Sequence, residues 1–572
     1  MMRKTCLNLL NEDSVNQVSP RFQQFYQEVF ADYFSRDPAR WPVFAEPGFK
    51  AMTQFRSLEL TPDQRLTAYP NGPELQQTLL ENSTIPSGRT KPTGQCDDIL
   101  AFAAALSKNW ENPSSVENVV TMPCDPAIYG SMMGTLANPN LVYSEYSGMA
   151  DQLEKNVVRQ IASLVDYDVP QATGLFTQGG TFCNLYGYLL GLRKSLPNAK
   201  FTGMGMIEDY RILNSQGGHY SNMTSLSLLG VDIRKKTIRI KVTESHNIDL
   251  DDMESQLRAC FAVNCRVPTI MLTMGTTDTF AVDQVKPVHD LRNRLCEEYE
   301  LSVRPHIHVD AAVGWSMIFF NSYDFASNPL EINQATLTGI ERTMQRVKEL
   351  KYADSFTVDF QKWGYVPYTS SLIMIKNKDD MKALENDPEN FSYFEHDLQG
   401  QTHLQSTIEC SRGAAGMFGA YSALKYMGLE GYQIVLAHCL QNANYFRHEL
   451  LKLGCVRLIA PENQGPSVGF RLYNLEWVTD VDAEFKIEQQ CMTNPDYAER
   501  LRRNSQWHRE VFNQCGKVGL YTNWVEFISR SAYNKHSKYS YIPGEKAVFM
   551  NPAAGREQID TFIANVRRVS GC

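Results

Sequence analysis

The sequence has no apolar run that approaches the roughly 20 residues needed by a membrane-spanning helix. It also has no long basic run, and its net charge is -9, so neither nucleic acid nor an anionic membrane is an expected partner. The segment from Met1 to Asn11 has only a short apolar patch, which Asn8 interrupts. A secretory signal peptide needs a longer apolar centre and a small-residue cleavage site, so we expect a cytoplasmic protein.

Cysteines at metal-binding spacing are also missing. The 13 cysteines are scattered along the chain, and no Cys-x-x-Cys pair occurs. This pattern argues against a disulfide framework and against a zinc site. The closest two cysteines, Cys260 and Cys265, lie in an apolar stretch, and we expect them to be buried free thiols.

The 572 residues exceed one ordinary domain, and a composition of 43% hydrophobic and 21% charged residues is typical of a soluble globular protein. We expect an N-terminal arm or layer over residues 1–115, a large domain over 116–408 and a smaller α+β domain over 409–572. The smaller domain is predicted from helical patterns at Ala414–Met427, Tyr432–Lys452 and Arg556–Val569 and a strand-like run at Val468–Tyr473.

Short β-like runs alternate with longer amphipathic stretches between residues 116 and 408. This alternation predicts an α/β fold with a mostly parallel sheet, whose ligands bind where strands turn into helices. The runs are Gly174–Thr177, Thr269–Thr273, Ile307–Val309, Ser355–Val358 and Ser371–Ile375, and the stretches are Asp151–Asp166, Thr181–Ser195, Asp249–Ala262 and Val285–Tyr299.

Two glycines separate the first of these runs from a helical pattern, in Thr177-Gln-Gly-Gly-Thr-Phe-Cys-Asn184. Glycines at such a turn let the backbone approach a bound group, and a helix start offers free N–H groups to a phosphate. Thr181 can add a hydroxyl or can simply cap the helix. Taken alone, the motif is weak, because glycines are common at strand-to-helix turns.

The segment Ile307-His-Val-Asp-Ala-Ala-Val-Gly314 places Asp310 at the end of a strand, beside small residues. An acid there can reach a flat ligand, although a lone aspartate at a strand end is more often a turn or cap residue. His306 and His308 alternate on one face of the strand and resemble a metal pair. No third ligand occurs at a helpful spacing, so we expect no metal site.

Lys362 follows the run Ser355–Val358, in a loop with Trp363 and Gly364. Burial beside an aromatic residue would lower the pKa of this lysine and make it an amine nucleophile. The alternative is an ordinary surface lysine. His219, in Gly217-Gly-His-Tyr-Ser221, can stack on an aromatic ligand or can make a hydrogen bond at a helix start.

No single segment decides the function, but together they match the parts of one cofactor. Pyridoxal phosphate needs a phosphate cradle, an amine for its aldehyde, an acid for its ring nitrogen and a flat group against its ring. The sequence supplies these at separate strand ends, in the order glycine turn, His219, Asp310 and Lys362.

These motifs resemble the group II pyridoxal-dependent decarboxylases, a family that includes glutamate, aromatic amino-acid and diaminobutyrate decarboxylases. The resemblance extends from about Pro123 to Met427 and more thinly beyond. It implies a fold-type-I subunit, with residues 116–408 as the domain that binds pyridoxal phosphate, and a homodimer with shared active sites. The expected activity is conversion of an L-amino acid, acidic or small and polar, into an amine and carbon dioxide.

The resemblance also implies roles for individual residues. Lys362 bonds to the cofactor, Asp310 pairs with its ring nitrogen, and His219 and Ala312 lie against opposite faces of the ring. The remaining expected contacts to the cofactor and its surroundings are Gly180, Thr181, Thr276 and Gln361.

A further match, Phe391-Ser-Tyr-Phe-Glu-His-Asp397, resembles the start of the family's catalytic loop, in which Tyr393 would serve decarboxylation from across a dimer interface. Plain packing is the alternative for this tyrosine. Relatives with phenylalanine at that position favour an oxidative, aldehyde-forming outcome, and a non-catalytic scaffold on the same fold is a third possibility.

Three positions depart from the family pattern. Gln361 replaces the histidine that usually precedes the lysine, and Asn222-Met-Thr replaces a segment that usually carries a lysine. Lys546 stands where an arginine often precedes Asn551-Pro552. Because lysine cannot grip a carboxylate through two parallel hydrogen bonds, the last departure leaves the contact to the substrate carboxylate open.

Overall fold

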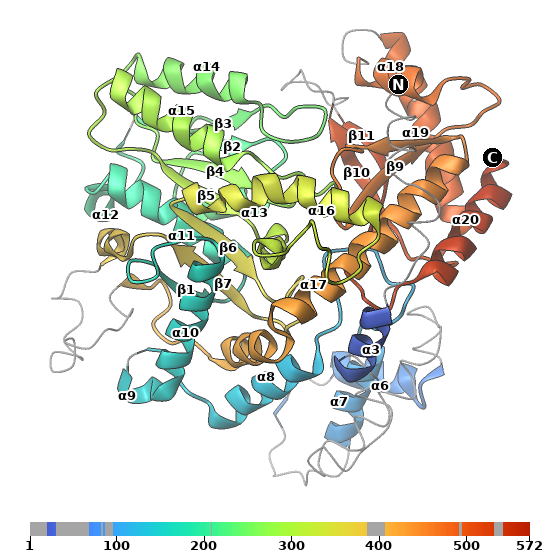
Figure 1. Ribbon diagram of the computed structural model, residues 1–572, viewed down its shortest axis with the longest axis horizontal. Helices are drawn as coiled ribbons and strands as arrows, with labels where there is room; N and C mark the ends of the chain where they lie inside the picture. Colours follow the sequence, from blue (N-terminus) through green and yellow to red (C-terminus); the bar gives the residue numbers. More distant parts are fainter. Residues whose placement is uncertain are drawn as a thin grey trace. The chain divides into compact units, whose positions relative to one another are not determined.

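A seven-stranded sheet forms the centre of the fold (Figure 1), in the order β1-β7-β6-β5-β4-β2-β3. Neighbouring strands from β3 to β6 pair in parallel, whereas β7 is antiparallel to both β6 and β1. All strands except β7 therefore run the same way, and the predicted mostly parallel sheet is confirmed. The strands are β1 (Thr173–Thr177), β2 (Ile212–Ser215), β3 (Thr237–Ile240), β4 (Thr269–Thr273), β5 (His306–Asp310), β6 (Ser355–Asp359) and β7 (Ser371–Ile375).

The computed structural model describes residues 20–29, 68–81, 84–85, 95–142, 144–207, 209–385, 406–490, 495–530 and 541–572. The chain divides into one unit of residues 1–25 and 113–572 and a second of residues 26–112. The second unit contains α6 (Gly72–Glu81) and α7 (Gln95–Leu106). The predicted boundaries near residues 115 and 408 stay predictions.

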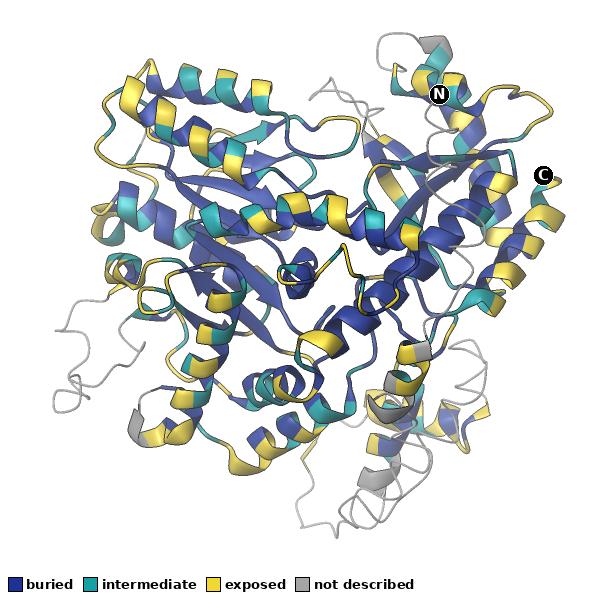
Figure 2. Ribbon diagram, in the orientation of Figure 1, coloured by how far each residue is buried: buried dark blue, intermediate teal, exposed yellow. Residues whose placement is uncertain are grey.

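The strands of the large sheet are buried along their length except at β3 and at the first residue of β1, as the dark central ribbons of Figure 2 show. This burial explains why they read as short, nearly continuous apolar runs, since a parallel sheet is covered on both faces. The predicted runs at Thr269–Thr273 and Ser371–Ile375 coincide with β4 and β7, and the other three differ from their strands by one residue at one or both ends.

Four predicted helices are present between residues 116 and 408: α10 (Met149–Leu164), α11 (Gly180–Ser195), α14 (Leu250–Phe261) and α15 (Val285–Glu298). Helix α11 packs across β5, β6 and β7. Two glycines on its sheet-facing side allow this approach, because a Cβ atom at Gly187 or Gly191 would overlap side chains of the sheet. The first turn of α11 is thereby fixed beside the ends of β5 and β6.

The C-terminal part forms a four-stranded antiparallel sheet in the order β10-β11-β9-β8. The two helices predicted over 414–452 are present and carry the single label α17; they meet at Gly428, whose φ of 58° and ψ of -166° are not helical. None of the described helices has the length and hydropathy needed to span a membrane. The elements here are α17 (Ala415–Lys452), β8 (Val456–Ile459), β9 (Ser467–Leu472), α18 (Val481–Gln489), α19 (Pro495–Cys515), β10 (Asn523–Arg530), β11 (Tyr541–Val548) and α20 (Arg556–Ser570).

A disulfide joins Cys455 to Cys572 across 117 positions. One bond is not a framework, but it was not expected from the sequence, because the two cysteines become adjacent only once β8 and α20 have packed. Cys260 and Cys265 are free thiols as predicted, the first buried and the second partly buried.

Candidate active site

A cavity of about 760 Å³ lies at the edge of the sheet where β1, β2, β4, β5 and β6 end. The segment after each of these strands contributes to its wall, as expected for a fold of this class. Tyr393 lies outside the described residues. All the other predicted site residues line this one cavity: Gly180, Thr181, His219, Thr276, Asp310, Ala312, Gln361 and Lys362.

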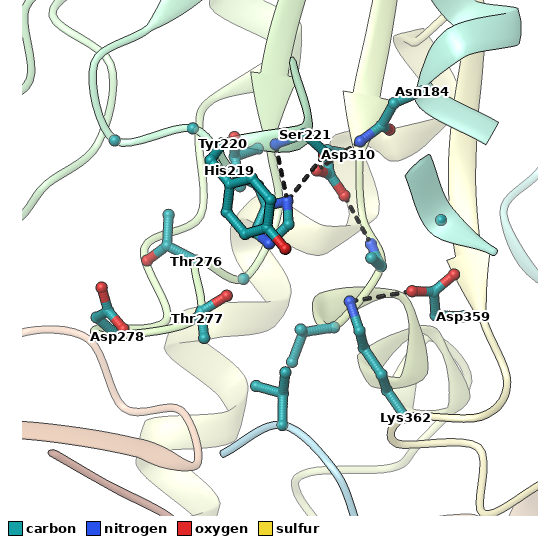
Figure 3. Close-up of a pocket in the computed structure, with 18 of the residues that line it drawn as sticks. Asn184, His219, Tyr220, Ser221, Thr276, Thr277, Asp278, Asp310, Asp359 and Lys362 are labelled. Carbon is teal, nitrogen blue, oxygen red and sulfur yellow. Dashed lines mark hydrogen bonds and ion pairs between the residues drawn. The ribbon is translucent and has the colours of Figure 1, made fainter. Parts of the chain in front are cut away.

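The Lys362 amine points into the cavity and pairs with Asp359, with Nζ 3.0 Å from Oδ2 (Figure 3). Burial on its own lowers the pKa of Lys362, but the charges of Asp359 and Asp310 outweigh burial and raise the pKa above its ordinary value. The expectation that desolvation would lower this pKa is therefore wrong in its net direction. The reason is Asp359, which the sequence argument overlooked.

Asp359 is held from its other side by β7. The Ser371 hydroxyl donates to Asp359 Oδ1 at 2.6 Å. The Gln361 amide in turn donates to the Ser371 oxygen at 2.7 Å and accepts from the Ser370 N–H at 2.7 Å. Gln361, which stands in place of the family's histidine, thus fixes the acid that pairs with Lys362.

Asp310, at the end of β5, is 6% exposed. Its Oδ2 accepts from Asn184 Nδ2 at 2.8 Å, and its Oδ1 accepts from the Ala312 N–H at 3.3 Å. The second bond is the turn interaction expected of an aspartate at a strand end. The first comes from α11 and holds the carboxylate at the cavity wall (Figure 3).

The glycine turn brings the start of α11 to the cavity. Gly179 is the N-cap, with a φ of 140° and no side-chain cap, so Thr181 is not the capping residue. A Cβ atom at Gly180 would lie 2.7 Å from Asp359 Oδ2, so this position has no room for a side chain. The first N–H groups of a helix lack acceptors within the helix, and they suit an anion here.

The hydrogen bond at a helix start that was the alternative for His219 is present, and stacking on a ligand stays a prediction. The ring lines the cavity, and its Nδ1 accepts from the Ser221 N–H at 3.2 Å, at the start of α13 (Ser221–Leu228). Because a backbone N–H can only donate, the neutral ring carries its proton on Nε2. Burial is the main cause that lowers the pKa of His219 below its ordinary value.

Thr276 and Lys546 complete the wall opposite the sheet. The Thr276 hydroxyl accepts from the Ala281 N–H at 2.9 Å, in a turn that begins at Gly275, where φ is 86°. Lys546, from β11, places Nζ 2.7 Å from Asp278 Oδ1. The position at which the sequence departs from the family pattern therefore does reach the cavity.

His306 and His308 do not form a metal pair with each other. His306 Nε2 and His308 Nδ1 both lie 2.7 Å from the Ser355 hydroxyl oxygen, so a β6 side chain occupies the nitrogens that would face a shared ion.

Sequence reasoning missed Asn184, Asp359 and Arg239, all of which line the cavity. Asn184 lies three residues after Thr181, one turn along the same helix face, and Asp359 ends a strand as Asp310 does. Those two signals were available in the sequence. No signal in the sequence marks Arg239, on the edge strand β3, because only the folded chain brings it to the cavity.

The lining fits pyridoxal phosphate. An amine, a buried carboxylate, a helix start without side chains at its glycines, and an imidazole ring converge on a space large enough for the cofactor and a small substrate. The carboxylate is fixed by two donors that belong to the protein itself, which suits a partner for a protonated ring nitrogen.

Comparison with known proteins also indicates a protein that uses pyridoxal phosphate. Residues 93–473 match the family described as "Pyridoxal-dependent decarboxylase conserved domain". The chain is 24% identical over 390 residues to the aspartate 1-decarboxylase of Aliivibrio fischeri, covering 64% of this chain and 65% of that enzyme. It is also 24% identical over 390 residues to the L-tyrosine decarboxylase of Enterococcus faecium, covering 57% and 62% of the two chains.

Among solved structures, mouse CSAD superimposes with a TM-score of 0.70 at 17% identity, covering 93% of this chain and 99% of that one. This likeness shows the fold. The alignments to the two curated enzymes span less than two thirds of either enzyme's length.

Proposed function

The chain belongs to the pyridoxal-dependent decarboxylase family, and from this premise we propose that it converts an acidic L-amino acid into an amine and carbon dioxide. Bound pyridoxal phosphate supplies a ring that accepts the electrons released when the bond from Cα to the carboxylate breaks. The observation that carries the reaction is the placement of the Lys362 amine, the Asp310 carboxylate and the start of α11 around one cavity.

Each lining residue has a role in this proposal. Lys362 holds the cofactor through its amine, and Asp310 accepts a hydrogen bond from the protonated ring nitrogen. His219 and Ala312 lie against the two faces of the ring, with the His219 proton on Nε2. The start of α11 at Gly180 and Thr181 binds the phosphate, and Thr276 borders the ring.

Arg239 supports an acidic substrate. Its Nη2 donates to the Gln216 carbonyl at 3.0 Å, while Nε is buried without a partner and Nη1 has none among the described residues. A buried donor without an acceptor costs about 1–3 kcal/mol, and a ligand carboxylate would offset that cost. A guanidinium is also the side chain best shaped to bind a carboxylate through two parallel hydrogen bonds.

Lys546 is suited to the other carboxylate, the one attached to Cα. Its side chain is 6% exposed, and only one of the three ammonium hydrogens is needed for Asp278. A lysine here gives a point contact, not a bidentate grip. This weaker hold is compatible with a group that must leave as carbon dioxide.

The test is a substrate panel scored by released carbon dioxide and by product. Aspartate, glutamate and cysteine sulfinate are compared with diaminobutyrate and tyrosine, using the parent protein, Arg239→Leu and Arg239→Lys. We expect the acidic substrates to be preferred, with amine and not aldehyde as product. Arg239→Leu should lower kcat/KM for them about 100-fold, as for loss of a buried charged pair.

Arg211→Leu is the matched control, because Arg211 is partly buried next to β2 but does not line the cavity. Preference for tyrosine, or an equal loss on every substrate in Arg239→Leu, would remove the case for an acidic substrate. An aldehyde product with peroxide would instead identify the oxidative reaction.

A homodimer with shared sites is part of the same proposal. It rests on the resemblance of the segment 391–397 to a catalytic loop that acts across a dimer interface. Mixing Lys362→Ala with Tyr393→Phe protein tests it, since heterodimers would regain one intact site and hence the amine formation that neither variant has alone. Failure of the mixture to regain activity, with dimers present, would contradict sharing.

A further inference from the structure

A chain of buried polar side chains runs from Asp310 away from the cavity and into the sheet. It starts with Asn184 on α11, continues through His308 on β5 and Ser355 on β6, and ends at His306 on β5. All four are at most 2% exposed. The donor–acceptor distances are 2.8 Å from Asn184 Nδ2 to Asp310 Oδ2, 3.1 Å from His308 Nε2 to Asn184 Oδ1, and 2.7 Å from Ser355 Oγ to each imidazole.

The direction of the hydrogen bonds in this chain follows from Asp310 and from Thr357. The Thr357 hydroxyl gives its hydrogen to Asn184, so His308 Nε2, 3.1 Å from the same hydroxyl oxygen, is left to act as a donor. A carboxylate only accepts, so Asn184 must present its NH₂ group to Asp310 and its Oδ1 to the opposite side. There Oδ1 accepts from the Thr357 hydroxyl at 2.8 Å. Because an amide oxygen also only accepts, the contact with His308 is a hydrogen bond only when His308 carries its proton on Nε2.

The remaining protons are then fixed in turn. His308 Nδ1 is left as an acceptor and takes the Ser355 hydroxyl hydrogen, and the Ser355 oxygen accepts from His306 Nε2. The far end, His306 Nδ1, has no hydrogen-bond partner among the described residues. Every donor therefore points toward Asp310, an arrangement in which hydrogen bonds in series polarise and strengthen one another.

Burial keeps the two imidazoles in the neutral form that this direction requires. Burial is the largest cause that lowers the pKa of His308 well below its ordinary value, and it lowers the pKa of His306 to about 4. The charged groups that act on His306 are two acids and two bases, Asp354, Asp380, Lys194 and Arg292. The nearest recorded contact is from His306 Nδ1 to Asp380 Oδ2, at 4.0 Å.

Helix α11 is shaped to accept this arrangement. A Cβ atom at Gly187 would lie 2.3 Å from the His308 ring, so the helix carries no side chain where the imidazole packs. The same helix supplies Asn184, one turn earlier, and its first turn lines the cavity. The position of His308 and the position of the Asn184 amide are therefore set by one rigid element.

We propose that Asn184 and His308 are positioning residues that hold Asp310 in the orientation required by the ring nitrogen of pyridoxal phosphate. Asn184 touches the carboxylate, and His308 acts through Asn184 by preventing the amide from turning over. An overturned amide would face Asp310 with its oxygen, acceptor against acceptor. The inference concerns cofactor binding alone, so it stands or falls independently of which substrate is decarboxylated.

The test compares His308→Leu with His308→Gln in the cofactor-loaded protein, without substrate. Glutamine can donate to Asn184 while accepting from Ser355, whereas leucine can do neither. The readouts are the dissociation constant of pyridoxal phosphate and the pH midpoint of its absorbance change when bound. We expect His308→Leu to weaken cofactor binding about tenfold and to move the midpoint upward. The midpoint should rise because a ring nitrogen held less firmly by Asp310 withdraws fewer electrons. His308→Gln should stay near the parent.

Thr269→Val is the matched control. Thr269 is fully buried on β4 and pairs in register with His306, yet its hydroxyl has no hydrogen-bond partner within the described part of the chain. Its replacement disturbs packing in the same sheet without breaking the chain, and it should leave both readouts unchanged. Parent-like values in His308→Leu, or equal changes in His308→Leu and Thr269→Val, would overturn the proposal.

A second route covers the case in which His308→Leu does not fold. Thr357→Val removes the other donor to Asn184 Oδ1 at nearly constant volume and should change both readouts in the same direction, but less. Each change is repeated in an Asp310→Asn background, where the effect of the second substitution on cofactor affinity should largely vanish. Full additivity there would show that the chain acts on general packing and would refute the proposal.

Discussion

Two aspartates end neighbouring strands of the sheet, and they differ in what holds them. Asp310 on β5 and Asp359 on β6 are both buried and both border the cavity. Asp310 receives hydrogen bonds from an amide side chain and a backbone N–H, and no cation lies within ion-pair distance of it among the described residues. Asp359 is paired with Lys362 and receives a hydroxyl hydrogen from Ser371.

The different partners of the two aspartates suit them to different tasks. A carboxylate held only by neutral donors keeps its charge available for a cationic ligand group, which in this family is the protonated ring nitrogen. A carboxylate that already pairs with a lysine instead sets the charge state of that lysine. In the proposed function, neighbouring strands thus supply one acid for the ring nitrogen of the cofactor and one for the lysine that would bond to it.

The largest effect is expected when Lys362, the cation that pairs with Asp359, is removed. Lys362→Ala should lower decarboxylation roughly 10⁴-fold or more, because the covalent hold on the cofactor is lost while its other contacts remain. Carbon dioxide release measures the activity, and borohydride reduction followed by mass spectrometry measures the bond. Lys286→Ala, at an exposed lysine on α15, is the control. A reduced, cofactor-labelled Lys362→Ala protein would show that another lysine carries the cofactor.

Neutralising the two acids in turn tests the comparison directly. Asp310→Asn should lower kcat roughly 10²–10³-fold, as for loss of a group that stabilises developing charge, with a changed cofactor spectrum. Asp359→Asn should leave the spectrum of the bound cofactor nearly unchanged. The pH profile and product analysis are measured on the same preparations. Equal losses and equal spectra in the two variants would contradict the division of tasks.

Asp359→Asn should have its main effect on Lys362. Burial lowers the pKa of this lysine and Asp359 is the largest single cause that raises it, so removing the negative charge should lower the pKa. More of the amine is then neutral at pH 7 to 9, and free cofactor should attach severalfold faster there. Stopped-flow absorbance against pH measures the rate. If the rate of cofactor attachment rose only at higher pH than in the parent, the pKa of Lys362 would have been raised by the substitution, and the prediction would be wrong.

Much of this arrangement could be predicted from sequence, because it follows from local signals. Buried strands appear as short apolar runs, and glycines and aspartates at their ends mark the edge where ligands bind. Asp310 and Lys362 were identified in this way. The expectation that one cofactor uses both came from the order of the motifs and from the family resemblance, and the structure brings both residues to one cavity.

The contacts that tune the site could not be predicted, because they join elements that meet only in the folded chain. Asn184 reaches Asp310 only because α11 crosses β5 and β6. Lys546 reaches Asp278 across 268 positions. The reversed sign for the pKa of Lys362 arose the same way, since burial was foreseen from the sequence and the charge of Asp359 was not.

Glu545 shows what burial does to a carboxyl group whose one basic neighbour among the described residues is kept neutral, and it gives the smallest predicted effect. That neighbour is His508, whose Nε2 lies 3.4 Å from Glu545 Oε2 and whose pKa is lowered well below its ordinary value by burial. This residue on β11 is 2% exposed, and burial raises its pKa from 4.5 to about 8, against a smaller lowering by the Thr522 hydroxyl. Between these two pKa values the folded protein keeps a proton that the unfolded chain has lost. The contribution of Glu545 to stability is therefore present at low pH and is lost as pH rises through this window.

Glu545→Gln should remove that loss, since glutamine does not titrate and can make similar contacts. We expect parent and variant to be similarly stable near pH 5, and the variant to be more stable by about 1–3 kcal/mol near pH 9. Urea unfolding at the two pH values measures the difference. Asp359→Asn is the contrasting case: its acid already has a cation partner, so its removal should bring no such gain at pH 9. If the free energy of unfolding changed with pH in the same way for the parent and for Glu545→Gln, Glu545 would be ionised in the folded protein. Burial without a cation partner would then not be enough to make Glu545 behave differently from Asp359, which is paired.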